Sequence, residues 1–210
     1  MLLDRPDGPL CVLVSGGADS ALLLYYLMSQ HNDTIHIYTM AAENKSYGKN
    51  AKRVPTIIKW CSEQTSNSNY THTVKNVPEQ SPPVLFADAL QWISTGHAVA
   101  LYTGVTANPP SDVMDTFSVS PSQEDINARD PTITRDVYNY KYKSYFPFWN
   151  IDKKRIAQLY TEADILPLFN LTSSCEWIHG FPHRPDINPQ VDHCGKCWWC
   201  QERMWAFGKL

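Results

Sequence analysis

The feature that most constrains the fold is an apolar run that leads directly into a glycine loop and then into a second apolar segment. Residues 10–14 (LCVLV) are continuously apolar, which is typical of a strand buried on both faces. Residues 15–20 read SGGADS, and residues 21–28 are rich in leucine, as in a buried helix. Because a strand, a glycine turn and a helix open a βαβ unit, the sequence predicts a parallel sheet.

The same alternation continues along the first half of the chain. We expect further strands at residues 34–40, 69–74 and 97–105. We expect helices between them at residues 49–61 and 87–95. This pattern predicts an α/β fold with a doubly wound, mostly parallel sheet. Ligands bind beyond the carboxyl ends of the strands in such sheets, so the loops after Val14, Met40 and Val105 should face one site.

The periodic pattern ends after residue 105. Residues 106–145 are polar and interrupted by prolines, and a stretch of this length without regular structure is usually functional or mobile. We interpret residues 118–145 as a polar insertion or lid. Asp152 is then expected to cap a helix that ends at Ala163, before a tail rich in cysteine and tryptophan.

Composition narrows the classes of partner. The formal net charge of −3 gives no sign of a basic face, so nucleic acid is not expected as the direct substrate. No apolar run approaches the roughly 18–20 residues that a membrane span needs, and the N-terminal residues show no secretory pattern. We therefore expect a cytoplasmic protein with no membrane partner.

The cysteines are unevenly placed. The chain has six, and in a cytoplasmic protein they are not expected to form a disulfide framework. Cys11 and Cys61 stand alone, while the tail holds Cys175, Cys194, Cys197 and Cys200. A C-x-x-C-x-x-C run with one distant cysteine offers four thiolates at a spacing typical of a closed, structural Zn²⁺ site.

Three other interpretations of the tail stay open. A site of three cysteines and one histidine could use His179, His183 or His193. The four thiols could also be reduced and unligated. An iron–sulfur cluster is disfavoured, because the ferredoxin pattern would have a cysteine and a proline where Met204 and Trp205 stand.

The SGGADS loop is typical of an anion site. Glycines let the backbone turn sharply and approach a ligand, and the N–H groups at the start of a helix attract phosphate. Ser15 and Ser20 can add hydroxyl donors. Asp19 would repel a phosphate unless a Mg²⁺ ion lies between them. The loop is neither a Walker A loop nor a dinucleotide fingerprint, and a glycine turn without a ligand is the alternative.

The loop resembles the SGGxDS loop of the N-type ATP pyrophosphatases, the PP-loop family. Members cleave ATP between the α and β phosphates and adenylate an acid or an amide. Their fold is of the adenine nucleotide alpha hydrolase type. The chain departs from many members at Ala21, where they carry serine or threonine.

The tail narrows the resemblance. Residues 194–207, with the three cysteines followed by Arg203, Ala206 and Phe207, resemble the C-terminal signature of the 7-cyano-7-deazaguanine synthase family. Residues 102–107, 148–163 and 170–175 are similar to further segments of that family. The family's loop after the position of Ala107 is replaced here, and residues 118–143 have no obvious counterpart, so we expect the substrate contacts to differ from those of the family.

The resemblance implies an ATP-dependent ligase that forms C–N bonds and releases AMP and pyrophosphate. It would adenylate 7-carboxy-7-deazaguanine and use ammonia to form an amide and then a nitrile. Residues 1–165 would be the PP-loop domain, and residues 166–210 would bind zinc. ATP, Mg²⁺ and Zn²⁺ are the implied cofactors.

The resemblance also implies roles for single residues. The catalytic residues would be Ser15, Asp19 and Ser20. The nucleotide site would comprise Ser15, Gly16, Gly17, Ala18, Asp19, Ser20, Met40, Lys49, Arg53 and Gly104. Substrate would contact Thr106, Asn108, Asp112, Asp115 and Arg203. The metal ligands would be Cys175, Cys194, Cys197 and Cys200.

Alternatives remain for some of these roles. The basic cluster of Lys45, Lys49, Lys52 and Arg53 could be a solvated helix face. Arg203 could instead donate hydrogen bonds to the metal loop. The tail tryptophans are expected in the core, although Trp177 or Trp198 could stack on a deazapurine.

Rival functions are a variant enzyme that stops at the amide, another acid-adenylating PP-loop enzyme, or a non-catalytic nucleotide- and zinc-binding interaction module. A tRNA-thiolating enzyme is disfavoured by the net charge and the short chain. A homodimer is compatible with the sequence.

Overall fold

The computed structural model describes residues 3–42, 50–77, 82–175 and 193–210. Within them lies a six-stranded sheet in the order β3-β2-β1-β4-β6-β5. The strands are β1 (Leu10–Leu13), β2 (Ile35–Ala42), β3 (Tyr70–Val77), β4 (Ala100–Tyr102), β5 (Tyr138–Asn139) and β6 (Ser144–Tyr145). Every pairing is parallel except that of β5 with β6. The predicted α/β fold with a mostly parallel sheet is therefore confirmed.

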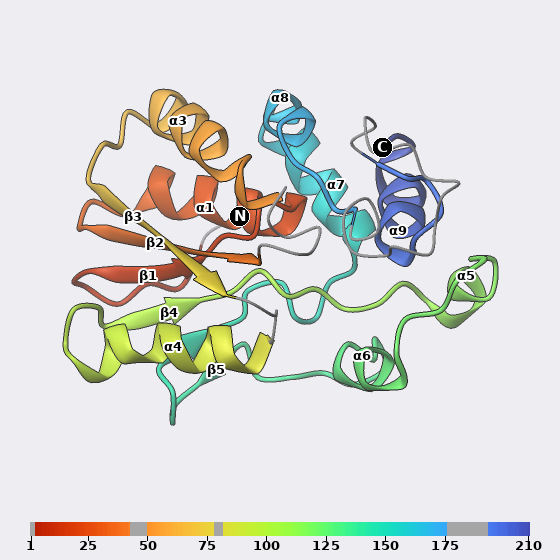
Figure 1. The fold of residues 1–210 in the computed structure, drawn as a ribbon, viewed down its shortest axis with the longest axis horizontal. Coiled ribbons are helices and arrows are strands. Elements are labelled where there is room, and N and C mark those ends of the chain that lie inside the picture. The colour runs from red at the N-terminus through yellow and green to blue at the C-terminus, as the bar shows by residue number, and fades with distance from the viewer. Residues whose placement is uncertain (1–2, 43–49, 78–81, 176–192) are drawn as a thin grey trace.

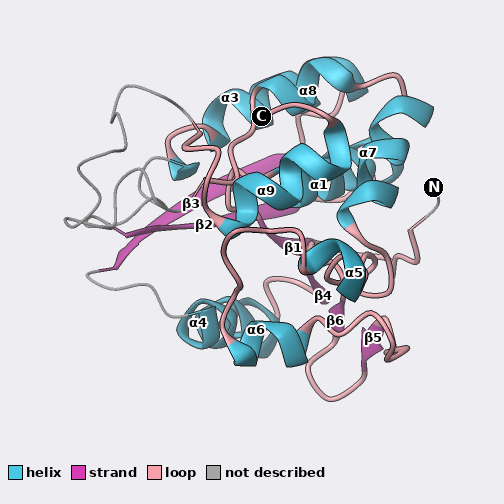
Figure 2. Cartoon of the chain, turned by 90° about the vertical axis from the view of Figure 1, so that its right-hand side faces the viewer, coloured by secondary structure: helices cyan, strands magenta, loops and turns pink. Residues whose placement is uncertain are grey.

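Helices cover both faces of this sheet (Figures 1 and 2). One side holds α1 (Ala18–Gln30), α3 (Val54–Thr65), α7 (Lys153–Glu162), α8 (Leu166–Asn170) and α9 (Trp198–Phe207). The opposite side holds α4 (Pro82–Ser94). Two short helices, α5 (Ser111–Met114) and α6 (Gln123–Ala128), lie in the segment after β4.

The side chains of β1 alternate between the two helical layers. Leu10 and Val12 belong to the larger core, which α1 and α3 share. Cys11 belongs to a smaller core with Leu101 of β4, against which Leu13 packs. Because successive residues of a strand point to opposite faces, the fully apolar run of β1 reflects burial on both sides, as the sequence predicts.

The strand order places a topological switch point between β1 and β4. From β1 the chain continues to β2 and β3 on one side of the sheet, and then returns to β4 on the other side. Crossovers on opposite sides of such a point leave a crevice at the carboxyl ends of the two strands. The glycine loop follows β1 and Gly104 follows β4, so both border this crevice.

Residues 118–145 differ in part from the predicted polar insertion. They include α6, and they also supply β5 and β6, the last two strands of the sheet. Sequence patterns miss these strands because each has only two residues. The segment is therefore built into the sheet at its far edge.

The last part of the chain shares the main core. Leu168 and Phe169 of α8 are buried with the residues of α1. Phe207 of α9 stacks on Phe169 with a centroid distance of 3.9 Å. Asp152 caps α7 as predicted, since its side chain accepts a hydrogen bond of 2.9 Å from the N–H of Arg155.

Several expected elements have different limits: the helix predicted at 87–95 is α4, from Pro82 to Ser94, and the strand predicted at 69–74 is β3, from Tyr70 to Val77. The strand predicted at residues 97–105 is only three residues long, and the helix predicted at 49–61 is described as α3 from Val54. Pro55 lies in the first turn of α3, where its missing N–H costs no hydrogen bond.

Among the described residues, no helix has both the length and the apolar character to cross a membrane.

Candidate functional site

The glycine loop is held by its two serines. The N–H of Ser15 donates to Oγ of Ser20 over 3.2 Å, and Oγ of Ser20 donates to the carbonyl of Gly17 over 3.1 Å. The two hydroxyl oxygens lie 3.2 Å apart. Gly17 is the N-cap of α1 and has no side chain to occupy the free N–H groups that follow. The N-terminus of α1 is thus pre-shaped with donors that suit an anion.

Two glycines permit close approaches around the loop. Gly16 has a φ of +89°, and a Cβ atom there would lie 2.2 Å from the carbonyl oxygen of Asn50. At Gly104 a Cβ atom would lie 3.1 Å from the backbone of Asp19 and Ser20. The end of β4 therefore packs directly against the first turn of α1, which requires a residue without a side chain.

A pocket of about 420 Å³ opens at this point. Its floor is the glycine loop, with Ser15, Gly17, Ala18, Asp19 and Ser20. The surrounding walls are largely apolar, with Leu13, Val14, Tyr38, Met40, Phe86, Gly104, Val105, Phe146 and Trp199. Asn50, Thr103, Lys153, Ser173 and Ser174 complete the lining. Mostly apolar walls with a few convergent polar groups are typical of a small-molecule site.

Four charged side chains form a buried chain beside the loop. Nζ of Lys153 lies 2.6 Å from Oδ2 of Asp19 and 3.5 Å from Oε2 of Glu202. Oε1 of Glu202 accepts a hydrogen bond of 2.6 Å from Arg129. The side chain of Lys153 is 5% exposed and that of Glu202 is fully buried. Two cations and two carboxylates balance, which makes their burial tolerable.

The pKa values of the two carboxyls shift in opposite directions. Burial raises the pKa of Asp19, although Lys153 pulls it down. Burial also acts to raise the pKa of Glu202, but the charges of Arg129 and Lys153 outweigh it and hold that pKa below its ordinary value. Glu202 has two cationic partners and Asp19 has one, so Asp19 is the carboxylate less satisfied by the protein.

Asp19 has a free coordinating atom. Its Oδ1 is buried, and among the described residues it has no hydrogen-bond partner. The carboxylate of a residue that lines a pocket beside an anion-binding loop is a suitable ligand for Mg²⁺. The residues present therefore fit the cation that the sequence predicts.

Most predicted nucleotide-site residues gather at this pocket. Of the predicted set, the lining includes Ser15, Gly17, Ala18, Asp19, Ser20, Met40 and Gly104. Arg53 instead precedes α3 and donates to the carbonyl of Leu171 over 3.5 Å. Lys45 and Lys49 lie outside the described residues.

The predicted substrate residues after β4 lie elsewhere. Thr106 is buried, and its carbonyl and hydroxyl accept hydrogen bonds from Arg129. Asn108 is buried and donates to the carbonyl of Ile126 in α6 over 3.2 Å. Asp112 and Asp115 are exposed at α5. These four residues are absent from the described pocket lining, because β4 ends at Tyr102 and the chain beyond Val105 turns toward α6.

Arg203 contacts the segment before Cys175, and it is not among the described residues of the pocket lining. It is almost fully buried and donates to the hydroxyl of Thr172 over 2.9 Å and to the carbonyl of Phe169 over 3.1 Å. Its guanidinium also stacks 3.7 Å from the Phe169 ring. These bonds hold the segment that leads to Cys175.

Sequence reasoning missed several residues of the site. Lys153 is one of three consecutive basic residues, and only the burial of its side chain distinguishes it from Lys154. Arg129 and Glu202 lie in segments without a motif for charge pairing. Among the tail tryptophans, Trp199 lines the pocket, whereas Trp198 is buried against Phe117. Trp177 lies outside the described residues.

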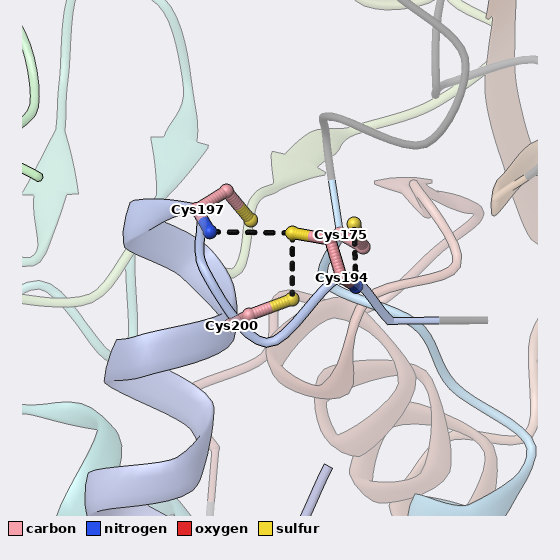
Figure 3. A group of neighbouring side chains, drawn as sticks. All are labelled: Cys175, Cys194, Cys197 and Cys200. Atoms are coloured by element: carbon pink, nitrogen blue, oxygen red, sulfur yellow. Dashed lines mark hydrogen bonds between the residues drawn. The ribbon is translucent and has the colours of Figure 1, made fainter. Parts of the chain in front are cut away.

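The four predicted metal ligands come together. The sulfur atoms of Cys175, Cys194, Cys197 and Cys200 all lie within 4.8 Å of one another (Figure 3). A tetrahedral Zn²⁺ site with four Zn–S bonds has sulfurs about 3.8 Å apart. The described group contains no histidine, and His179 and His183 lie outside the described residues. The cluster therefore fits a four-sulfur site.

Backbone groups and burial prepare this cluster for a cation. The N–H groups of Lys196 and Cys197 point at Sγ of Cys194, over 3.4 and 3.2 Å. Hydrogen bonds with the thiols of Cys175 and Cys197, together with burial, raise the pKa of Cys200. Thiolates this close repel one another unless a metal neutralises them, so the arrangement favours a bound cation.

Comparison with known proteins gives no family for the chain. No protein-family model matches the sequence, and no curated protein matches it. Among solved structures, one match is the reductase domain of the aureusimine biosynthetic cluster, with 17% identity and a TM-score of 0.30. The match covers 80% of this chain and 47% of that one, so this chain spans about half the length of that structure. A likeness at this TM-score carries no argument.

Proposed function

We propose that the protein binds ATP with its phosphates on the glycine loop and uses it to adenylate 7-carboxy-7-deazaguanine. One observation carries the proposal. The SGGADS loop and the free N-terminus of α1 form the floor of an apolar pocket at the switch point between β1 and β4. Anions bind at such helix starts, and nucleotides bind at such switch points.

The reaction needs activation because a carboxylate has no good leaving group. In the proposed first step a carboxylate oxygen attacks the α-phosphorus of ATP, the bond to the β-phosphate oxygen breaks, and pyrophosphate leaves. Ammonia then attacks the acyl carbon, AMP departs with the former carboxylate oxygen, and loss of a proton gives the amide. The amide oxygen then attacks the α-phosphorus of a second ATP and a second pyrophosphate leaves, after which loss of AMP and protons gives the nitrile.

The chain's own groups would stabilise the charge that moves in these steps. The N–H groups at the start of α1 and the hydroxyls of Ser15 and Ser20, residues that line the pocket, would stabilise the negative charge that develops on pyrophosphate. Lys153 supplies a buried positive charge next to this loop. Asp19 would hold Mg²⁺ through its free oxygen, and that ion would neutralise phosphate charge.

The walls of the pocket suit a planar ring. Phe86, Phe146 and Trp199 bring three aromatic side chains to one pocket, and Phe86 and Phe146 are stacked with a centroid distance of 6.2 Å. Flat heteroaromatic rings bind between such groups by stacking. Both the adenine of ATP and a deazapurine acid meet this requirement.

The cysteine cluster would have a structural role. A zinc ion with four sulfur ligands has no open position for water, so it would not take part in the chemistry. It would instead fix the start of α9, where Cys197 is the N-cap and Cys200 lies in the first turn. Trp199 and Glu202 project from the same helix toward the pocket and its charged neighbours.

The experiment is a turnover assay with ATP, Mg²⁺, ammonia and 7-carboxy-7-deazaguanine, with AMP measured and the product identified by mass. The proposal expects AMP that depends on the acid, and the mass of the nitrile. The amide mass alone would point to the variant that stops one step earlier. Nucleotide binding without AMP from any acid would favour a binding module.

A matched pair of variants ties turnover to the loop. Asp19→Asn keeps the shape of the side chain and removes its charge, and turnover should fall at least about a hundredfold, as for other electrostatic groups at a reacting centre. Asp136→Asn removes an exposed carboxylate at a distance from the pocket lining and should leave turnover unchanged. Equal activity of both variants would contradict the assignment.

A further inference from the structure

Lys153 is shared between two carboxylates that face different surroundings. Asp19 lines the pocket, and its side chain is 18% exposed. Glu202 is fully buried behind it and is also bound to Arg129. The ammonium lies closer to Asp19, at 2.6 Å, than to Glu202, at 3.5 Å. Lys153 thus has one carboxylate on the ligand side and a second one in the protein interior.

The position of the ammonium bears on the proposed role of Asp19. Among the described residues Oδ1 of Asp19 has no hydrogen-bond partner, so a divalent cation there would share the carboxylate with Lys153 on Oδ2, and the two cations would repel each other at low dielectric. The ammonium also cannot be left in the interior without a counter-ion. A second anionic partner would reduce this repulsion when Asp19 takes a metal ion, and Glu202 is already within 3.5 Å of Lys153.

We propose that the ammonium of Lys153 pairs with Asp19 until the metal–nucleotide complex binds, and that Glu202 then becomes the carboxylate partner of this ammonium. Glu202 is thus a positioning residue. The inference rests on the proposed nucleotide site. In the described form Lys153 neutralises Asp19. When Mg²⁺ and the phosphates arrive, Lys153 moves toward Glu202 and the phosphate oxygens, and Asp19 is released to the metal. Arg129 keeps Glu202 ionised and in place.

Charge balance supports this exchange. Asp19, Lys153, Glu202 and Arg129 together carry no net charge in the described form. A magnesium–nucleotide complex brings its own cation and anions, so after the exchange each carboxylate still has a cationic partner. Each buried charge has a partner of opposite sign before and after the exchange, so the exchange has a low cost in electrostatic free energy.

The first experiment measures binding of an ATP analogue with a methylene group between the α and β phosphorus atoms across a series of Mg²⁺ concentrations. For Glu202→Gln, the Mg²⁺ concentration at half-maximal binding should rise about tenfold, because Lys153 then has only Asp19 as a carboxylate partner. Saturating Mg²⁺ should restore the affinity to within about threefold of the unchanged protein. Glu162→Gln, which removes a surface partner of Arg155, should change neither quantity.

A merely structural role of Glu202 would give a different result. It would lower affinity by the same factor at every Mg²⁺ concentration, or leave it unchanged, and either outcome would overturn the proposal. Because Glu202→Gln also leaves Arg129 without its carboxylate, the double variant with Arg129→Met is a second test. The double variant removes one charge of each sign, and its Mg²⁺ concentration at half-maximal binding should rise by the same factor.

The second experiment uses Mn²⁺ alone, read by electron paramagnetic resonance in protein free of nucleotide. Lys153→Met should bind Mn²⁺ about tenfold more tightly than the unchanged protein, because no ammonium competes for Asp19. Lys154→Met, at the exposed neighbouring position, should match the unchanged protein, and adding Asp19→Asn to Lys153→Met should abolish the gain. Equal Mn²⁺ affinity of both lysine variants would overturn the exchange. This result does not depend on which acid is adenylated, so it separates failure of the inference from failure of the proposed function.

Discussion

Nζ of Lys153 lies 2.6 Å from Oδ2 of Asp19, although 134 positions separate the two residues in the chain. A second contact repeats this link, since the hydroxyl of Tyr160 donates to the carbonyl of Ala18 over 2.7 Å. Both contacts join α7 to the first turn of α1. The glycine loop is thus fixed by a helix from the far end of the chain, and its geometry depends on tertiary packing as well as on its own glycines.

Gly16→Ala should damage the loop more than a comparable change elsewhere. Gly16 combines a φ of +89° with a Cβ position 2.2 Å from a backbone oxygen, so strain of about 1–3 kcal/mol is joined by a clash. Gly96→Ala is the matched control, because its φ is +74° and nothing lies within 4 Å of its Cβ position. Chemical denaturation should show a larger decrease in the free energy of unfolding for Gly16→Ala than for Gly96→Ala. Calorimetry should show loss of nucleotide binding for Gly16→Ala alone.

We expect the purified protein to contain about one zinc ion per chain, because four sulfur atoms converge at a spacing that suits this metal. Cys197→Ala should lose the metal and lower the melting temperature, because the start of α9 is then no longer fixed. Cys61→Ala changes an equally buried cysteine outside the cluster and should retain the metal. Elemental analysis measures the metal content of the protein and of both variants. Iron in place of zinc would refute the assignment of a zinc site.

Alkylation at pH 8 should separate the cysteines into two groups. Burial raises the pKa of Cys11 to about 12, so its thiolate fraction is roughly a thousandfold below that of a free cysteine. Burial raises the pKa of Cys61 as well. After chelation, Cys194, which is partly exposed, should react with iodoacetamide long before these two, as mass spectrometry of the labelled peptides can show. Early labelling of Cys11 would contradict its placement within β1.

Trp199→Ala should weaken binding of a ring-containing ligand by about 5- to 150-fold, the range expected for loss of one stacking side chain. The matched control is Trp205→Ala, because Trp205 lies on the same helix against Lys154 and is not among the described residues of the pocket. The affinity can be measured by calorimetry with the ATP analogue and with the deazapurine acid. Equal losses in both variants would indicate a general effect on α9.

The parts of the fold that sequence reasoning predicted are those encoded locally. The run at residues 10–14 predicts a strand buried on both faces, and the alternation of strands and helices gives the mostly parallel sheet. The spacing of Cys194, Cys197 and Cys200 likewise predicts their convergence, because a short loop alone brings such residues together. These signals need no knowledge of distant contacts.

The predicted residues that do not gather at the pocket, and the residues that sequence reasoning missed, are those whose place depends on distant packing. Thr106 and Asn108 follow β4 as substrate residues would, but Arg129 and α6 bind them in the interior, away from the described pocket lining. Neither periodicity nor spacing in the sequence marks Lys153 and Glu202, because a buried ion pair can be recognised only when the positions of both residues are known. Their part in the site becomes visible only once α7 and α9 are placed next to the loop.

Oxygen transfer tests most directly our proposal that ATP activates a carboxylate at the glycine loop. The acid is prepared with ¹⁸O in its carboxylate and incubated with ATP, Mg²⁺ and ammonia. Because each adenylated oxygen departs with AMP, formation of the amide should place one label in AMP, and formation of the nitrile should place both labels in two AMP molecules. Mass spectrometry of AMP reads the result. Product formed with unlabelled AMP, or with ADP and labelled phosphate, would contradict the account.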